Sequence, residues 1–178
     1  MAESPSSSRI TSADLIACVE ETMQVATLRY FTRAGPFAEA VRSETGMPLP
    51  GALEAREAGP LILLWRSPTE TLCVTRNAAR LAELGTKLAA AAEGCMVDLT
   101  AGMQIVRLTG LRIPELLCRL GGTASVPAPG EARRSRVADV PVLTLSLRAG
   151  EALLLVDSAY LPHLLAWIRE TLLDFEAS

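Results

Sequence analysis

The sequence predicts an α+β fold, in which mixed or antiparallel sheets pack against helices. Short apolar segments with strand-like alternation occur in runs, and amphipathic segments with helical spacing interrupt these runs. Apolar residues make up 49% of the 178 residues and aromatic residues only 4%, so leucine, valine and alanine must fill the core. A chain of this length is expected to form one well-buried domain, which we assign to residues 10–178, after a disordered tail over residues 1–9.

The first half of the chain is expected to begin with a short helix over Thr11–Glu21 and a strand over the alternating segment Gln24–Phe31. A second helix should end near Gly46, and residues 47–60 should form a long connection.

A hairpin is predicted next, because the apolar segments Leu61–Trp65 and Thr71–Thr75 flank Ser67-Pro68-Thr69, which has turn chemistry. The helix that follows is predicted over Asn77–Ala92, with Gly94 as its stop.

The second half is expected to repeat this pattern of strand, helix, hairpin and helix, which gives two related lobes. Its expected elements are strands at Met96–Leu99 and Gln104–Leu108, a helix over Ile113–Leu120 ended by Gly121-Gly122, a loop to Gly130, a hairpin of Val137–Leu147 with Ala152–Val156, and a helix from Ser158. The last helix should bury one stripe, made of Leu161, Leu164, Leu165, Ile168, Leu172 and Phe175.

The charge pattern argues against nucleic acid as a partner. The formal net charge is −3, and Lys87 is the only lysine, so no basic tract can displace counterions from a phosphate backbone. The polar N-terminal segment has no apolar stretch typical of a signal peptide, and no window approaches 18 uncharged apolar residues. We therefore expect a cytoplasmic protein without a membrane partner.

Metal and nucleotide motifs are absent. Cys18, Cys73, Cys95 and Cys118 are far apart and form no C-x-x-C pair, so buried free thiols are the better interpretation. No G-x-G-x-x-G, P-loop, G-x-S-x-G or H-E-x-x-H motif occurs. We therefore predict no catalytic residue, metal site or cofactor on this chain, and we expect its single histidine, His163, to have no role in chemistry.

Five residues are candidates for contact with a partner. Arg133, Arg134 and Arg136 are expected in a loop, where they can grip a carboxylate tail or an acidic patch, although a solvated cluster fits equally well. Trp65 and Trp167 are large aromatic residues of the kind that interfaces favour, but core packing is the stronger alternative for Trp167.

Several motifs resemble the gamma subunits of heterotetrameric sarcosine oxidases, which are relatives of the folate-binding aminomethyltransferase fold. They are the hairpin from Trp65 to Leu72, Val97-Asp98-Leu99-Thr100, Arg107-Leu108-Thr109-Gly110, Pro129-Gly130-Glu131-Ala132, Val140-Pro141-Val142-Leu143 and Tyr160–Trp167. The similarity covers roughly Leu61–Phe175, and the chain departs from the family pattern between Gly121 and Pro127.

The resemblance implies an aminomethyltransferase-like fold and a structural role. The chain would pack against the large alpha subunit of a complex that also has beta and delta subunits. The partner subunits would carry FAD, FMN, NAD and tetrahydrofolate, and the complex would demethylate sarcosine or a related N-methyl amine. The alternative is a stand-alone folate-binding or one-carbon transfer protein of the same fold.

Asp98 and Arg107 are the candidate residues for folate or another anion. The resemblance implies that a carboxylate at Asp98 can hold a pterin-like amide edge in a folate cavity, beside an arginine. A turn-capping role is the stronger alternative for Asp98, because aspartate often caps the turn after a strand.

Overall fold

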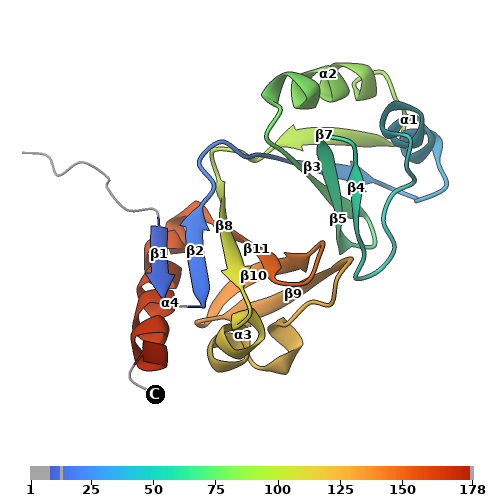
Figure 1. The fold of residues 1–178 in the computed structure, drawn as a ribbon. Helices are drawn as coiled ribbons and strands as arrows, with labels where there is room; N and C mark the ends of the chain where they lie inside the picture. Colours follow the sequence, from blue (N-terminus) through green and yellow to red (C-terminus); the bar gives the residue numbers. More distant parts are fainter. Residues whose placement is uncertain (1–8, 13, 177–178) are drawn as a thin grey trace, which may run out of the picture.

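The computed structural model describes residues 9–12 and 14–176, which form two antiparallel sheets and four helices (Figure 1). The predicted α+β class is confirmed. Residues 1–8 of the predicted tail lie outside the described residues, whereas Arg9, assigned to the same tail, begins the first strand. Among the described residues, no helix has the length and apolar character needed to cross a membrane.

The first lobe is a five-stranded sheet with two helices on one face. In spatial order, its strands are β4 (Ala55–Ala58), β5 (Leu61–Ser67), β6 (Glu70–Thr75), β3 (Gln24–Tyr30) and β7 (Gly94–Asp98). The helices are α1 (Pro36–Thr45) and α2 (Ala78–Leu88).

The second lobe is a six-stranded sheet with the other two helices. In spatial order, its strands are β1 (Arg9–Ser12), β2 (Leu15–Val19), β8 (Met103–Gly110), β11 (Glu151–Asp157), β10 (Val140–Ser146) and β9 (Glu131–Val137). The helices are α3 (Ile113–Gly121) and α4 (Leu161–Glu176), and two 3-10 turns, η1 (Thr123–Ser125) and η2 (Ser158–Tyr160), complete the lobe.

The two lobes repeat one topology and exchange one strand. Each has a strand, a helix, a three-stranded meander and a helix: β3, α1, β4–β6 and α2 in the first lobe, and β8, α3, β9–β11 and α4 in the second. The strand that precedes each unit in the sequence pairs with the sheet of the other unit. β2 precedes β3 but pairs with β8, and β7 precedes β8 but pairs with β3. The predicted internal repeat is thus present, with a meander in place of each hairpin.

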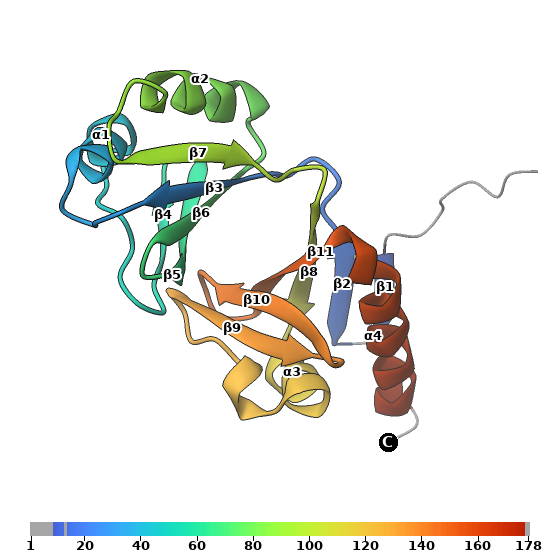
Figure 2. The same ribbon diagram turned by 180° about the vertical axis from the view of Figure 1, so that it is seen from behind.

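The sheets face each other and the helices cover the outer faces (Figure 2). In β3, Ala26 and Leu28 pack beneath α1 and α2, while Val25, which alternates with them, faces the second sheet. The inner faces form one shared apolar cluster that includes Leu72 and Leu143. On one side the edge strands meet through backbone hydrogen bonds, from Ala55 N to Gly130 O at 2.8 Å and from Ala132 N to Leu53 O at 2.9 Å.

The predicted helix over Thr11–Glu21 is wrong. This segment forms the antiparallel pair β1 and β2, and β2 also pairs with β8. Leu15 and Ala17 are buried in the α3 and α4 core, whereas Ile16 and Cys18 are half-buried on the other face, which is the two-residue period of a strand. Pairing with a distant strand therefore overrides the local capping signal.

Two further predictions miss strands. The long connection over residues 47–60 contains β4. The single strand predicted over Val137–Leu147 is wrong, because this segment contains the last residue of β9, a two-residue turn and then β10. Ala138 and Asp139 form the turn, with positive φ of 50° and 62°. Such a turn usually contains asparagine or glycine, so the Ala-Asp sequence did not indicate a hairpin turn here.

The helix ends agree in part. α1 ends at Gly46, with φ of 74°, and α3 ends at Gly122, also with φ of 74°, as expected. The helix predicted over Asn77–Ala92 instead ends at Leu88, and Gly94 is the first residue of β7. A Cβ atom on Gly94 would lie 2.3 Å from the ring of Phe37, so close packing explains this glycine.

Candidate functional site

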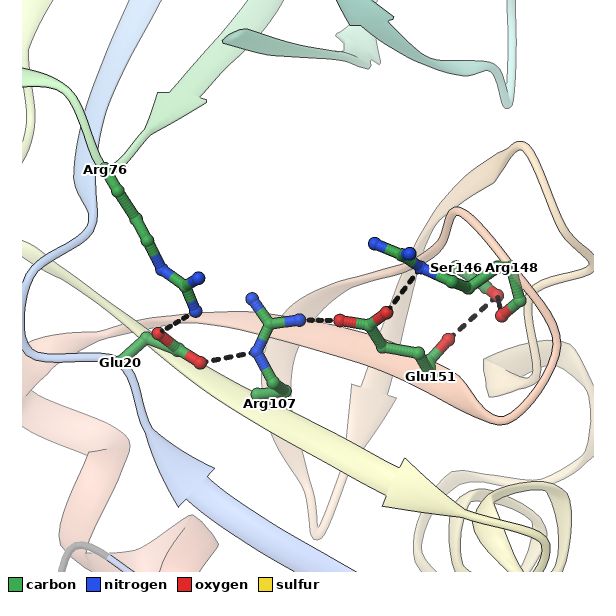
Figure 3. A network of polar contacts seen from close by, with 6 residues as sticks. All are labelled: Glu20, Arg76, Arg107, Ser146, Arg148 and Glu151. Atoms are coloured by element: carbon green, nitrogen blue, oxygen red, sulfur yellow. Dashed lines mark hydrogen bonds and ion pairs between the residues drawn. The ribbon is translucent and has the colours of Figure 1, made fainter. Parts of the chain in front are cut away.

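A groove of about 570 Å³ opens between the sheets at the end where β6 leads into α2. Five charged residues line it or lie at its edge and contact one another; we call them the charged network (Figure 3). They are Glu20, Arg76, Arg107, Arg148 and Glu151.

Strand register places the side chains of Arg107 and Glu151 on the inner side of the second sheet. Arg107 lies in β8 opposite Leu153 of β11, and Leu153 belongs to the apolar cluster between the sheets. Glu20 follows β2, where its backbone N–H donates to Ile105 O at 2.8 Å. Glu151 begins β11, and Ser146 Oγ, which donates to its carbonyl oxygen at 2.9 Å, fixes the preceding turn.

Every charge in the network has an opposite charge beside it. Arg107 pairs with both Glu20 and Glu151. Arg76 Nη2 lies 2.7 Å from Glu20 Oε2, and Arg148 Nε lies 2.7 Å from Glu151 Oε2. Burial raises the pKa of Glu20, but hydrogen bonds from Arg107 and Arg76 outweigh burial and hold this pKa below its usual value.

This arrangement favours binding and structure over acid–base catalysis. A carboxylate held ionised by arginines is a poor general acid at neutral pH. The Arg76 and Arg148 side chains are 57% and 68% exposed, so both can hold an anion at the mouth, above apolar side chains that include Met23 and Leu145. Within residues 9–12 and 14–176, no group of His, Cys, Asp and Glu side chains is placed to hold a metal ion.

A second groove of about 600 Å³ lies between the sheets and contains three arginines; we call it the β9 groove. Arg134 and Arg136 come from β9, and Arg66 comes from β5 of the other lobe. The predicted loop for Arg133, Arg134 and Arg136 is therefore wrong, because all three lie in a strand. Arg133 Nε pairs with Glu131 at 2.7 Å.

Asp98 and Arg107 do not share a groove. Arg107 lines the groove of the charged network, whereas Asp98 lines a separate hollow with Leu81 and Met96. Asp98 is exposed, and its Oδ1 accepts a hydrogen bond from Thr100 N at 2.8 Å; this bond lowers the pKa of the carboxyl group. The geometry at Asp98 is that of a turn cap.

The two tryptophans differ in exposure. Trp65 is half-buried in β5, where it pairs with Thr71 of β6. Trp167 is 51% exposed on α4, so core packing accounts for only part of its surface. His163 is exposed on α4, and its Nε2 lies 3.0 Å from the carbonyl oxygen of Ala138 in the turn between β9 and β10.

Four members of the charged network were not predicted from the sequence, namely Glu20, Arg76, Arg148 and Glu151. Glu20 and Arg107 are 87 positions apart, so no local pattern connects them. Arg148 and Glu151 have the spacing of a turn pair and lie between the two strands expected for the last hairpin. Knowledge that β2 pairs with β8 is the signal that would have revealed the network.

The chain is similar to known proteins in its three-dimensional structure. No protein-family model and no curated protein sequence matches the chain. A chain of heterotetrameric sarcosine oxidase from Corynebacterium sp. U-96, solved in complex with pyrrole 2-carboxylate, is similar with a TM-score of 0.84 and 20% identity, over 96% of this chain and 90% of that chain. Glycine cleavage system aminomethyltransferase T from Bartonella henselae is similar with a TM-score of 0.65 and 17% identity, over 89% of this chain and 46% of that chain. The protein therefore has the aminomethyltransferase-like fold that these two structures share.

Proposed function

We propose that this chain is a non-catalytic assembly subunit of a flavoprotein complex like heterotetrameric sarcosine oxidase. The observation that carries this proposal is the match over 96% of this chain and 90% of one chain of that oxidase. The match to aminomethyltransferase T covers only 46% of that protein's chain. The chain thus corresponds in extent to a subunit of an oxidase complex and to less than half of the transferase.

In this proposal the chain takes the place of the gamma subunit and packs against a large alpha subunit, with beta and delta subunits completing the complex. FAD, FMN, NAD and tetrahydrofolate belong to the partners, and the reaction is oxidative demethylation of sarcosine or a related N-methyl amine. The charged network supports a non-catalytic role, because its carboxylates are all neutralised by arginines.

Exposed apolar side chains support a role in assembly. Phe31 is 84% exposed and Leu111 is 87% exposed, and both are large apolar side chains that a partner surface would remove from water. Further exposed large side chains are Leu53, Val97, Tyr160, Trp167 and Leu173.

The alternative of a stand-alone folate-binding protein has less support. It needs a cavity lined by Asp98 and an arginine, but Asp98 caps an exposed turn, apart from the groove that Arg107 lines. The same experiment decides between the two functions.

The test is purification of an affinity-tagged copy of the chain from its native cells. We expect it to co-elute in a defined stoichiometry with subunits whose visible absorption spectrum is that of a flavin, and the complex to oxidise sarcosine or a related N-methyl amine. A chain that elutes alone, without flavin and with tetrahydrofolate bound, would instead identify the stand-alone protein.

A further inference from the structure

We propose that the β9 groove binds an extended acidic segment of a partner subunit, with carboxylates at alternate positions along that segment. This inference rests on the proposed assembly function and names the surface and the partner chemistry.

The β9 groove holds more positive charge than its surroundings neutralise. Arg66, Arg134 and Arg136 line it, and Asp157 is the carboxylate among the described lining residues. Asp157 Oδ1 accepts a hydrogen bond from Ala159 N at 2.9 Å, and its single negative charge stands against the three guanidinium charges of the lining. A positive groove on a chain with a net charge of −3 is a local feature that favours an anionic partner.

The arginines of this groove are weakly paired, in contrast to those of the charged network. The guanidinium group of Arg134 has no hydrogen bond or ion pair with any described residue, and that of Arg136 donates to the carbonyl oxygen of Asp139. Arg66 Nε lies 3.6 Å from Glu70 Oε2, while Arg29 holds Oε1 of the same carboxylate at 2.9 Å. These guanidinium groups therefore retain donors for a carboxylate from outside the chain.

The spacing of the arginines fits an extended chain. Arg134 and Arg136 are alternate residues of β9, so they project from one face about 6.6 Å apart along the strand. Arg134 lies opposite Leu143, which belongs to the cluster between the sheets, so this face of β9 is the one that borders the groove. An extended partner segment presents its alternate side chains at the same spacing, which matches one carboxylate to each arginine.

The walls of the groove restrict the ligand further. β5 and β9 are in contact, so Arg66 stands on the lobe opposite Arg134 and Arg136. Buried leucines, including Leu72 and Leu155, line the same groove and provide an apolar floor. A segment lying in this groove is held by charge from both lobes and by apolar contact beneath it.

The binding test uses two fluorescent seven-residue peptides of identical composition, each with three glutamates and four threonines. One has glutamates at alternate positions, and the other has them three residues apart. We expect fluorescence anisotropy to show tighter binding of the alternating peptide. Arg134→Gln and Arg136→Gln should each weaken this binding roughly three- to tenfold.

Arg133→Gln is the matched control, because it removes the same charge from the same strand at a residue that is paired with Glu131 and absent from the groove lining. We expect it to change binding less than about twofold. Equal weakening by all three substitutions, equal binding of both peptides, or no binding to the unmodified protein would overturn the inference. Full competition by citrate at the same carboxylate concentration would also overturn it, because the groove would then be a small-anion site.

The complex provides the second readout, as the yield of flavin per tagged chain recovered from native cells. The double substitution Arg134→Gln with Arg136→Gln should lower this yield several-fold, whereas Arg133→Gln should leave it unchanged. An unchanged yield with the double substitution contradicts the groove inference alone. Absence of flavin with the unmodified chain contradicts the proposed function itself.

Discussion

Glu20 and Arg107 form an ion pair that joins the segment leading into β3 to the middle of β8 (Figure 3). Glu20 also holds Arg76, which directly follows β6 of the first lobe, and Arg107 also holds Glu151 of the second lobe. The side chains of Glu20 and Arg107 are only 12% and 22% exposed, so solvent screens their attraction less than at an open surface. The charged network therefore fastens the two lobes together at one end of the space between the sheets.

Glu20→Gln should destabilise the protein at neutral pH by about 1–3 kcal/mol, because Arg76 and Arg107 lose a charged acceptor. The pKa of Glu20 is lowered in the folded state, so its stabilising effect is present above the unfolded value near 4.5 and is lost as pH falls through the folded value. Urea unfolding from pH 7 to pH 3 should therefore show the two proteins converging in acid. A difference that is constant over this range would contradict the assignment.

The close approach of Gly94 to Phe37 gives a packing test. A Cβ at Gly94 would lie 2.3 Å from the Phe37 ring and 2.7 Å from the Arg29 carbonyl oxygen, so Gly94→Ala should cost about 1–3 kcal/mol through overpacking. Gly102→Ala is the control, because the nearest atom there is the Leu99 carbonyl oxygen at 3.7 Å, and it should change stability by less than about 0.5 kcal/mol. Thermal melts measure both, and equal melting temperatures would rule out the tight contact.

The sequence predicted those elements that end at residues typical of turns or of helix ends. The hairpin of β5 and β6 was predictable because Pro68 and Thr69 turn the chain between two apolar segments. α1 and α3 end at glycines in conformations that other residues adopt with difficulty. The paired strands β1 and β2 were not predicted, because β2 is stabilised by pairing with β8, almost a hundred residues later. The local sequence of β2 does not indicate such a distant pairing.

The candidate sites were less predictable than the fold for the same reason. Arg134 and Arg136 were recognised as a cluster, but the strand that orients them was hidden by the turn at Ala138 and Asp139. Asp98 and Arg107 were expected to act together from a resemblance, and the structure places them in different hollows. Grooves formed between two sheets depend on how the lobes pack, which the sequence states only indirectly.

The buried face of α4 should account for much of the stability of the second lobe. Ile168 is fully buried against the sheet, so Ile168→Ala should cost about 2–5 kcal/mol. Leu165, on the predicted stripe, is only partly buried, so Leu165→Ala should cost less. His163→Ala should cost no more than about 1.5 kcal/mol, because it removes one hydrogen bond to Ala138 at the surface. Chemical denaturation ranks the three, and a larger loss for Leu165→Ala than for Ile168→Ala would contradict the packing described.

Three of the four cysteines should react in an order set by burial. Cys95 and Cys118 are exposed, whereas Cys73 is fully buried, and burial raises the pKa of the Cys73 thiol to about 12. Because the thiolate is the reactive form, a thiol reagent at pH 8 should modify Cys95 and Cys118 quickly and Cys73 only after unfolding. Cys73→Ala should remove this last phase and leave the fast phase unchanged. Rapid modification of Cys73 in the native protein would show that the first lobe opens more readily than its packing implies.

If the proposed function is right, substitution of Trp167 should affect assembly with partner subunits more than it affects folding. Because its side chain is 51% exposed, Trp167→Ala should destabilise the isolated chain by no more than about 1 kcal/mol. If this face of α4 contacts a partner, loss of the indole should weaken assembly by 2 kcal/mol or more, which is about thirtyfold, as is typical of tryptophans at the centre of interfaces.

The control is Arg169→Ala, an exposed neighbour on the same helix, which should leave assembly within about threefold of the unmodified chain. Gel filtration of co-expressed subunits over a dilution series measures both variants, with thermal melts of the isolated chain in parallel. Normal assembly of Trp167→Ala, or an equal loss for both variants, would exclude this face of α4 as the specific contact and move the search to the exposed side chains of Phe31 and Leu111.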